Sequence, residues 1–299
     1  MPIETRLSVI ISSPKVQNLS NGQRRFLEAV EELVRSKGLR ILAESADSDT
    51  VTDDITKTNR CHGVLVLAFE QWNARRLNRD RDKDVVMPSE FTHIKAVTAA
   101  ASRRPLLVLR EKSLADRGVL RAGYLQHMVK LPNSLKTEWL DGTEFQSEFK
   151  KWRDEIDCFR HVFLGYSSQA SETGEQLCRF LSDELKLRVF DWHNFHSGDS
   201  IWESIVSAER YTNCGVFLFM ADDALTAGTK APRDNVVYEA GYFAGAKGGK
   251  SAVIVMEEGA KVPTDLQGIL YLKLGKRRDI TPIKEALRDR LQQMLGADS

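Results

Sequence analysis

Two kinds of hydrophobic pattern alternate along the chain, and together they predict strands followed by helices. Short runs that are apolar at nearly every position are typical of strands buried on both faces of a parallel sheet. In the first half we predict such strands at Leu7–Ser12, Leu39–Ala43, Gly63–Phe69 and Pro105–Arg110. Between them, apolar residues recur at helical spacing, as over residues 26–34, or form an Ala-rich helical stretch at 90–101. This alternation predicts a doubly wound α/β sheet.

The second half of the chain repeats this plan. Its predicted strands are Val162–Tyr166, Arg188–Asp191, Gly215–Met220 and Ala252–Met256, and its helices include Gly174–Lys186 and Asn235–Lys247. Landmarks pair across the halves at a spacing of about 150 residues, namely Gly63 with Gly215, Glu90 with Glu239 and Gly118 with Gly268. The pairing favours a tandem duplication, although two unrelated flavodoxin-like sheets of similar size would also align in this way.

We therefore expect an α/β protein of two tandem flavodoxin-like domains, each a parallel sheet flanked by helices. The boundary is placed after an amphipathic helix around residues 144–157, which begins at a capping box formed by Thr143 and Gln146. The domains are then residues 1–157 and 158–299.

Composition and charge limit the function classes. The net charge is only +1, so nothing in the bulk electrostatics favours direct nucleic-acid binding or a membrane surface. No apolar run approaches the roughly 18 residues that a membrane helix needs, and the N-terminus lacks a signal-peptide pattern. We expect a cytoplasmic protein. One local basic cluster is interspersed with aspartates and is interpreted as a solvated loop: Arg75, Arg76, Arg79, Arg81 and Lys83.

Neither the cysteines nor the histidines form a convincing metal site. The four cysteines have no CxxC spacing and favour packed thiols in a reducing compartment: Cys61, Cys158, Cys178 and Cys214. His193 and His196 have Asp191 and Asp199 nearby, but loop spacing of this kind is common without a metal. We expect no bound metal.

Polar and aromatic residues follow the first two predicted strands of the second half. Ser167 and Ser168 stand where open α/β sheets bind ligands, so they either contact a phosphate or ribose or merely cap the next helix. Trp192 and Phe195 follow the second strand. An aromatic ring there can stack on a base, which is worth roughly 1–3 kcal/mol, or it can pack on the domain edge.

A glutamate early in a predicted helix is the strongest candidate for chemistry. Asp234 or Asn235 is the expected N-cap of this helix, and Glu239 lies four residues beyond Asn235, on the same face. Gly241, Ala244 and Gly245 leave another face small, which is expected to let the helix lie tightly on the sheet. A buried carboxylate without a partner is costly, so Glu239 is either functional or paired, for example with Arg233 or the helix dipole.

Four segments of the second half occur in the order and spacing of one family. They are FLGYSS at residues 163–168, VFDWHNF at 189–195, PRDNVVYEAG at 232–241 and VPTDLQGI at 262–269. Together they resemble the bacterial TIR-like predicted nucleotide-binding domains, including those fused to STING modules in cyclic-nucleotide antiphage systems. The resemblance extends from Phe163 to Leu274. The first half shows the general plan only, with some likeness to nucleoside deoxyribosyltransferase-type folds.

The resemblance implies a regulated enzyme that cleaves NAD⁺. By motif position Glu239 is its catalytic residue, and the expected substrate-binding residues are Ser167, Ser168, Trp192, Phe195, Asp234 and Asn235. The resemblance further implies NAD⁺ as the substrate, no additional cofactor, and ADP-ribose or its cyclic form as the product. Relatives become active on assembly, which implies a homo-oligomer triggered by a nucleotide second messenger or an activating protein. A role in antiphage defence is implied in the same way.

Two other functions compete with this one. The protein could be a non-enzymatic nucleotide sensor that signals through partner proteins. Alternatively, the first half could transfer nucleosides with Glu90, although the segment around Glu90 lacks the Arg-Asp-Asn triplet found at 233–235 and no Trp follows its second strand. We interpret the first half as a regulatory or assembly domain.

Overall fold

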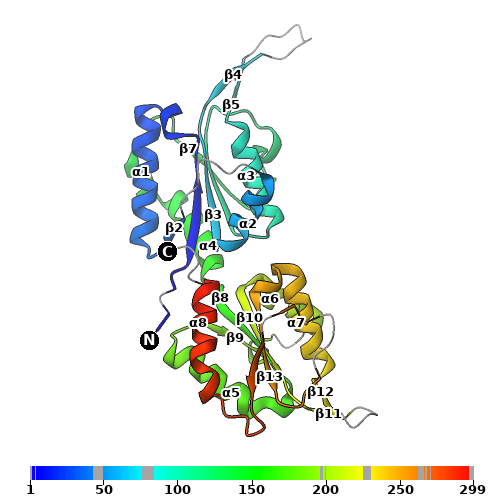
Figure 1. Cartoon of the computed structure of the whole chain (residues 1–299). Helices are drawn as coiled ribbons and strands as arrows, with labels where there is room; N and C mark the ends of the chain where they lie inside the picture. Colours follow the sequence, from blue (N-terminus) through cyan, green and yellow to red (C-terminus); the bar gives the residue numbers. More distant parts are fainter. Residues whose placement is uncertain are drawn as a thin grey trace. The chain divides into compact units, whose positions relative to one another are not determined.

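The computed structural model divides into two units, each built on its own sheet. The structure describes residues 2–3, 5–42, 50–75, 84–195, 198, 200–224, 230–261, 266, 268–269 and 271–295. One unit is Arg6–Cys158, and the other is Phe159–Ser299 together with Met1–Thr5. In each unit, helices cover both faces of a central sheet (Figure 1).

The first unit contains a five-stranded parallel sheet in the order β2-β1-β3-β6-β7. Its strands are β1 (Ser8–Ser12), β2 (Arg40–Leu42), β3 (Gly63–Ala68), β6 (Leu106–Glu111) and β7 (His127–Leu131). A short antiparallel hairpin, β4 (Trp72–Ala74) with β5 (Val85–Met87), follows β3. The helices are α1 (Asn21–Ser36), α2 (Val51–Arg60), α3 (Glu90–Ala101) and α4 (Thr143–Asp157).

The second unit has the same topology, in the order β14-β13-β10-β8-β9. The strands are β8 (Arg160–Gly165), β9 (Val189–Phe190), β10 (Thr212–Phe219), β13 (Ala252–Glu257) and β14 (Tyr271–Leu274). A hairpin of β11 (Asp223–Ala224) and β12 (Lys230–Ala231) follows β10. The helices are α5 (Ser171–Arg179), α6 (Ile201–Arg210), α7 (Asp234–Lys247) and α8 (Lys284–Leu295). Counted along the chain, both sheets have the strand order 2-1-3-4-5, which confirms two tandem flavodoxin-like folds.

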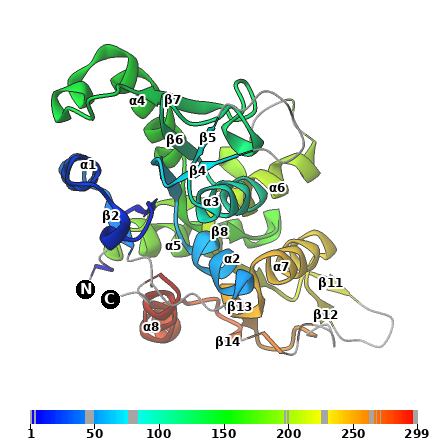
Figure 2. The same cartoon turned by 90° about the horizontal axis from the view of Figure 1, so that it is seen from above.

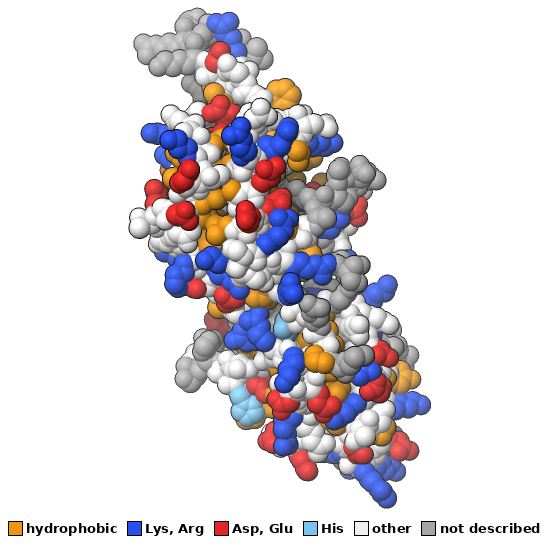
Figure 3. All heavy atoms as spheres, turned by 90° about the vertical axis from the view of Figure 1, so that its left-hand side faces the viewer, with side chains coloured by type: hydrophobic (Ala, Val, Ile, Leu, Met, Phe, Trp, Pro, Cys, Tyr) orange, Lys and Arg blue, Asp and Glu red, His pale blue; other side chains and the backbone are white. Residues whose placement is uncertain are grey.

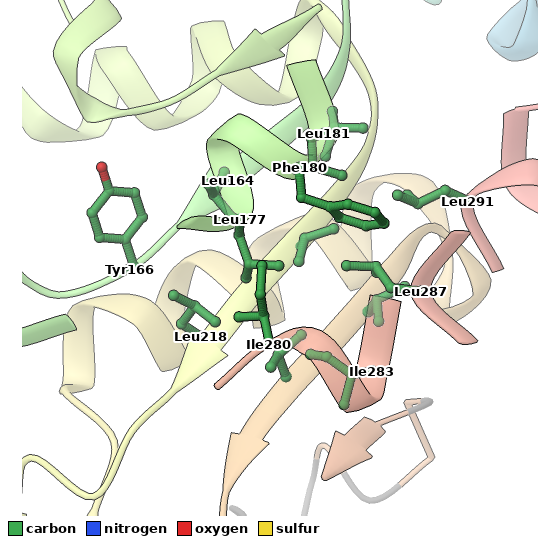
Figure 4. Packing of buried hydrophobic residues seen from close by; sticks show 14 of the residues in the cluster. Leu164, Tyr166, Leu177, Phe180, Leu181, Leu218, Ile280, Ile283, Leu287 and Leu291 are labelled. Atoms are coloured by element: carbon green, nitrogen blue, oxygen red, sulfur yellow. The ribbon is translucent and has the colours of Figure 1, made fainter. Parts of the chain in front are cut away.

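Two hydrophobic layers sandwich the second sheet, with α7 and α8 on opposite sides of β13 (Figures 1 and 2). On one side, α5 continues as a π-helix at Phe180–Glu184, and Phe180 faces Leu287 and Leu291 of α8 (Figure 4). On the other side, Phe243 of α7 stacks on Phe163 of β8 with ring centroids 5.0 Å apart. Because both faces are covered, the strands are apolar at almost every position, as the sequence predicted.

The N-terminal residues belong to the second unit, which the sequence analysis did not anticipate when it assigned residues 1–157 to one domain. The Ile3 side chain is buried in the core of the second unit, with 6 % of its surface exposed. Its backbone N–H donates a hydrogen bond to the Leu185 carbonyl, 3.0 Å away. The chain thus begins in the second unit, forms the first, and returns at Phe159.

Several properties predicted from composition can be compared with the structure. All four cysteines are free thiols, and Cys61 and Cys214 are fully buried. Acidic and basic side chains are interspersed on the face shown in Figure 3, in keeping with the small net charge. In the described ranges, no helix is long and apolar enough to cross a membrane. Of the basic cluster, Arg76, Arg79, Arg81 and Lys83 lie outside the described residues.

Candidate active site at the carboxyl edge of the second sheet

The strands β8, β10 and β13 are parallel, so their carboxyl ends meet at one edge of the sheet. The helices that follow β8 and β10 cover opposite faces: Leu177 of α5 packs in one core layer and Phe243 of α7 in the other. The position between β8 and β10 is therefore a topological switch point, where open α/β sheets bind ligands. Most residues predicted for the site lie around this edge.

Glu239 lies against the end of β8. It is the sixth residue of α7 and is buried, with 7 % of its surface exposed. A Cβ atom added to Gly165, the last residue of β8, would lie only 2.6 Å from Glu239 Oε2, so the glycine leaves room for the carboxyl group. Within the described residues this carboxyl group accepts no hydrogen bond, and the ion pair with Arg233 considered from the sequence does not form. Burial raises the pKa of Glu239 to about 7.

The start of α7 differs from the sequence prediction. The N-cap is Arg233, with no side-chain cap bond, and Asp234 is the first helical residue, so the prediction of Asp234 or Asn235 as N-cap was wrong. Asp234 Oδ1 instead accepts the N–H of Asn235 at 2.8 Å, and Arg233 pairs with Asp223 at 3.4 Å. Asp234 and Asn235 are both exposed, one turn before the buried Glu239.

The glycines of α7 do not lie on the sheet. A Cβ atom added to Gly241 or Gly245 would meet nothing within 4 Å, so the expectation of close helix–sheet packing was wrong for the two glycines. Ala244, the third small residue, is partly buried against the core layer. The buried face of α7 consists of Val236, Glu239, Ala240 and Phe243. At helical spacing the two glycines fall outside this face, on the solvent side.

The two serines after β8 have different environments. Ser167 is buried, and its hydroxyl donates a hydrogen bond of 2.5 Å to Asp222 Oδ2, in the segment after β10. Ser168 is exposed and begins a short 3-10 helix, Ser168–Ala170. Neither serine makes a side-chain cap bond to the helical turns that follow.

The two aromatic residues after β9 also have different environments. Trp192 is 48 % exposed, its ring stacks on His193 at 3.7 Å, and it meets the edge of Tyr166 at 6.5 Å. Phe195 is partly buried and packs on Phe163 with ring centroids 6.5 Å apart, against the same core layer as α7. Trp192 is therefore half-exposed beside Tyr166, the residue that follows β8, whereas Phe195 is packed against the core.

Three charged residues that the sequence analysis missed form a network at this edge. Arg278 donates to Glu257 at the end of β13, and its Nη2 lies 3.8 Å from Asp222 Oδ1. Burial acts to raise the pKa of Glu257, but the hydrogen bonds from Arg278 and from the Ala221 N–H, together with the charge of Arg278, lower this pKa below its ordinary value. Asp222 could have been found as the first charged residue after the apolar strand at 215–220, but nothing in the sequence marked Arg278.

The first unit carries a lysine where the second carries Glu239. Over their first seven residues, α3 and α7 have the same order of exposed and buried positions, which matches Lys95 with Glu239. Lys95 is buried and its Nζ lies 3.1 Å from Asp54 Oδ1. Glu90 is the exposed first residue of α3, so pairing it with Glu239 was wrong. The cause is the connection between β3 and α3, which is longer than that between β10 and α7.

The described residues offer no cluster of three metal-ligating side chains. Asp191 caps the turn at Trp192–Asn194 by accepting the His193 N–H, and its Oδ2 lies 3.2 Å from His193 Nδ1. His196 and Asp199, the other residues considered for a metal, lie outside the described residues, as do 262–265 and 267 of the fourth family segment.

Residues 161–276 match the family model described as the TIR domain of the CAP12/Pycsar effector protein. Similar proteins named CD-NTase-associated protein 12 come from Lachnospiraceae bacterium (strain RUG226), with 29 % identity over 139 residues, and from Flavobacterium daejeonense, with 31 % over 118. A third, from Sphingobacterium faecium, is 28 % identical over 140 residues. These alignments cover 44 %, 38 % and 44 % of this chain and 44 %, 38 % and 43 % of the relatives. The chain thus matches less than half the length of these relatives.

Proposed function

Since the C-terminal half of the chain is a bacterial TIR domain of the CAP12/Pycsar effector type, we propose that it cleaves the nicotinamide–ribose bond of NAD⁺ with Glu239 as the catalytic residue. The observation that carries this proposal is the Glu239 carboxyl group, which is buried at the carboxyl edge of the sheet without a hydrogen-bond donor among the described residues. Such a group costs stability, so a role in catalysis accounts for its presence.

The chemistry requires little more than this carboxylate. Breaking the nicotinamide–ribose bond gives an oxocarbenium-like transition state, while the bonding electrons leave with nicotinamide as a neutral molecule, so no general acid is obligatory. A carboxylate held beside the ribose stabilises the developing positive charge. The low dielectric around Glu239 strengthens that interaction. Water then forms a bond to C1′ of the ribose and releases a proton to solvent to give ADP-ribose, or an adenine nitrogen forms the bond to C1′ to give a cyclic product.

The other predicted residues are assigned binding roles in this proposal. Trp192 is half-exposed and is assigned the role of stacking on a base. Ser167 and Ser168 follow the strand against which Glu239 lies. Asp234 and Asn235 are exposed at the start of its helix, where their side chains can hydrogen-bond the hydroxyl groups of a ribose. Phe195 packs on Phe163 and is assigned to the apolar layer next to the site. No cofactor is required besides the substrate NAD⁺.

We assign the first unit a regulatory or assembly role. Lys95 occupies the position of Glu239 there, and an ammonium group would oppose rather than stabilise a cationic transition state. A chain with one catalytic and one non-catalytic unit suits an effector that is silent until a nucleotide second messenger or an activating protein orders its oligomer. In this proposal the protein acts in bacterial antiphage defence.

Nicotinamide release by the full chain tests the proposal. Wild-type protein, Glu239→Gln and Glu175→Gln are compared, alone and with a panel of cyclic mono- and dinucleotides. Glu175 is the matched control because its side chain is 63 % exposed on α5. We expect release by the wild type and Glu175→Gln and a loss of at least 100-fold in Glu239→Gln. Equal turnover by all three would remove the role of Glu239, and tight nucleotide binding without product would favour the non-enzymatic sensor.

A further inference from the structure

A hydrogen bond joins the ends of the two strands that flank the switch point. The Ser167 hydroxyl, two residues beyond β8, donates to Asp222 Oδ2, three residues beyond β10, at 2.5 Å. Both side chains are buried, with 4 % of Ser167 and 2 % of the Asp222 side chain exposed. Gly165, against which the Glu239 carboxyl group lies, is only two residues before Ser167. The bond therefore lies at the proposed catalytic edge.

Arg278 lies next to the second carboxylate oxygen of Asp222, the one that does not bond to Ser167. Its Oδ1 is buried and accepts no hydrogen bond within the described part of the chain, but it lies 3.8 Å from Arg278 Nη2. Arg278 also donates to Glu257 at 2.9 Å and to the Gln169 carbonyl at 3.2 Å. Its backbone has φ of 56°, a left-handed conformation that a long side chain rarely adopts. Backbone strain of this kind persists only where the surrounding contacts hold it. Here one arginine contacts Gln169 after β8, Asp222 after β10 and Glu257 at the end of β13.

The fold itself does not require this arrangement. In the first unit, Glu111 at the end of β6 accepts the Glu70 N–H, just as Glu257 at the end of β13 accepts the Ala221 N–H. The glutamate-to-backbone contact is thus common to both sheets. In the described part of the first unit, however, no carboxylate accepts a hydrogen bond from Ser12 or Ser13, and the Ser13 hydroxyl donates to its neighbour Pro14. The hydrogen bond between Asp222 and Ser167 is therefore found in the unit that contains Glu239. The first unit, which has Lys95 at the corresponding position, folds without such a bond in its described part.

We propose that Asp222 is a positioning residue that fixes Ser167 as a hydrogen-bond acceptor for a ribose hydroxyl of the substrate. A serine has one O–H donor and two lone pairs. When the proton is committed to Asp222, only the lone pairs remain, and the adjacent carboxylate makes the oxygen a stronger acceptor. A ribose hydroxyl can donate to it, and a deoxyribose cannot at that carbon. This inference rests on the proposed function and specifies a ribonucleotide as its substrate.

The test compares substrates that differ by one hydroxyl group. Nicotinamide release by the full chain is measured with NAD⁺ and with analogues that lack the 2′- or the 3′-hydroxyl of the nicotinamide ribose. The variants are Asp222→Leu, which removes the acceptor of the serine proton, and Asp222→Asn, which keeps an acceptor oxygen. Asp223→Asn is the matched control, because Asp223 is the adjacent aspartate, is 41 % exposed and pairs with Arg233.

We expect the wild type to lose about 10- to 100-fold in kcat/KM, mainly through KM, with one of the two analogues. Asp222→Leu should lose a similar factor with NAD⁺ but little further with that analogue, because the hydroxyl no longer has an oriented partner. Asp222→Asn should stay within about threefold of the wild type, as should Asp223→Asn. A loss in Asp222→Leu that is the same for NAD⁺ and both analogues would show a merely structural role and overturn the proposal.

Two further measurements keep the test decisive. If Asp222→Leu does not fold, Ser167→Ala replaces it, with the same expected loss of discrimination between NAD⁺ and the analogue. If the wild type releases no nicotinamide either alone or with the panel of cyclic mono- and dinucleotides, the proposed function fails by itself, and the affinity of the full chain for ADP-ribose and its 2′- and 3′-deoxy forms is measured by calorimetry. Binding that is at least tenfold weaker for one deoxy form supports the positioning role, and equal affinities contradict it.

Discussion

At the scale of single residues, Glu239 has a pKa that places its ionisation within the physiological range. Burial raises this pKa to about 7. If the carboxylate is the form that stabilises the transition state, kcat/KM for NAD⁺ should rise about tenfold per pH unit below 7 and level off above it. Initial rates of nicotinamide release between pH 5 and pH 9 provide the measurement. A profile that is flat across this range would show that ionisation of Glu239 does not limit catalysis.

The same burial links Glu239 to stability. Between pH 4.5 and about 7 the unfolded chain has lost this proton while the folded chain retains it, so the folded state loses stability as the pH rises through that window. The cost reaches about 3 kcal/mol above pH 7. Glu239→Gln, which cannot ionise, should therefore unfold with a free energy up to about 3 kcal/mol higher than the wild type at pH 8, and with little difference at pH 4.5. Denaturant titrations at the two pH values test this, and an advantage that does not depend on pH would contradict it.

The sequence supported Glu239 better than its neighbours at the site. The family motif assigned Glu239 its role, and the structure buries its carboxyl group beside Gly165. Asp222 was missed although it is the first charged residue after an apolar strand. Arg278 was missed because its contacts depend on three strand ends meeting at one edge, which pattern and spacing do not encode. For Phe195 the sequence left substrate contact and packing on the domain edge open, and the structure shows its ring packed on Phe163.

At the scale of elements, the close approach of α7 to β8 depends on Gly165. An alanine Cβ there would lie 2.6 Å from Glu239 Oε2 and 2.8 Å from Phe217 Cδ1. Gly165→Ala should therefore displace the carboxyl group, lower nicotinamide release at least tenfold and destabilise the second unit by about 1–3 kcal/mol. Gly245→Ala is the control on α7: its Cβ meets open space, so activity should be unchanged and stability should rise by about 0.5–1 kcal/mol. If Gly165→Ala keeps full activity, the close contact is not required for catalysis.

Element types were predictable because buried parallel strands and the turns between them leave strong patterns. The helix predicted at 90–101 has the bounds of α3, and the apolar run at 252–256 lies within β13. Correspondence between the two units was less predictable. A spacing of about 150 residues led to the pairing of Glu90 with Glu239, but the hairpin after β3 lengthens its connection and moves Lys95 into that position. Loop length varies freely at the surface and is invisible to such an alignment.

At the scale of the whole molecule, the order of the chain differs from the order of its folding units. Ile3 precedes the first unit in sequence but is buried in the second, where it contributes a side chain to the core and a backbone hydrogen bond to Leu185. A single apolar residue ahead of a predicted strand gives no indication of the unit in which it is buried. The sequence therefore did not predict that Ile3 belongs to the second unit. The second unit therefore depends on residues that a division at Phe159 would remove.

This dependence can be measured in the full chain. Ile3→Ala should lower the free energy of unfolding of the second unit by about 2–4 kcal/mol, the usual cost of truncating a buried aliphatic side chain. In calorimetry, the transition of the second unit is the one that Glu239→Gln raises at pH 8, and Ile3→Ala should lower that same transition while leaving the other in place. Val16→Ala, at a position that is 55 % exposed in the first unit, should shift neither by more than about 0.5 kcal/mol. A shift of the other transition by Ile3→Ala would show that the N-terminus stabilises the first unit instead.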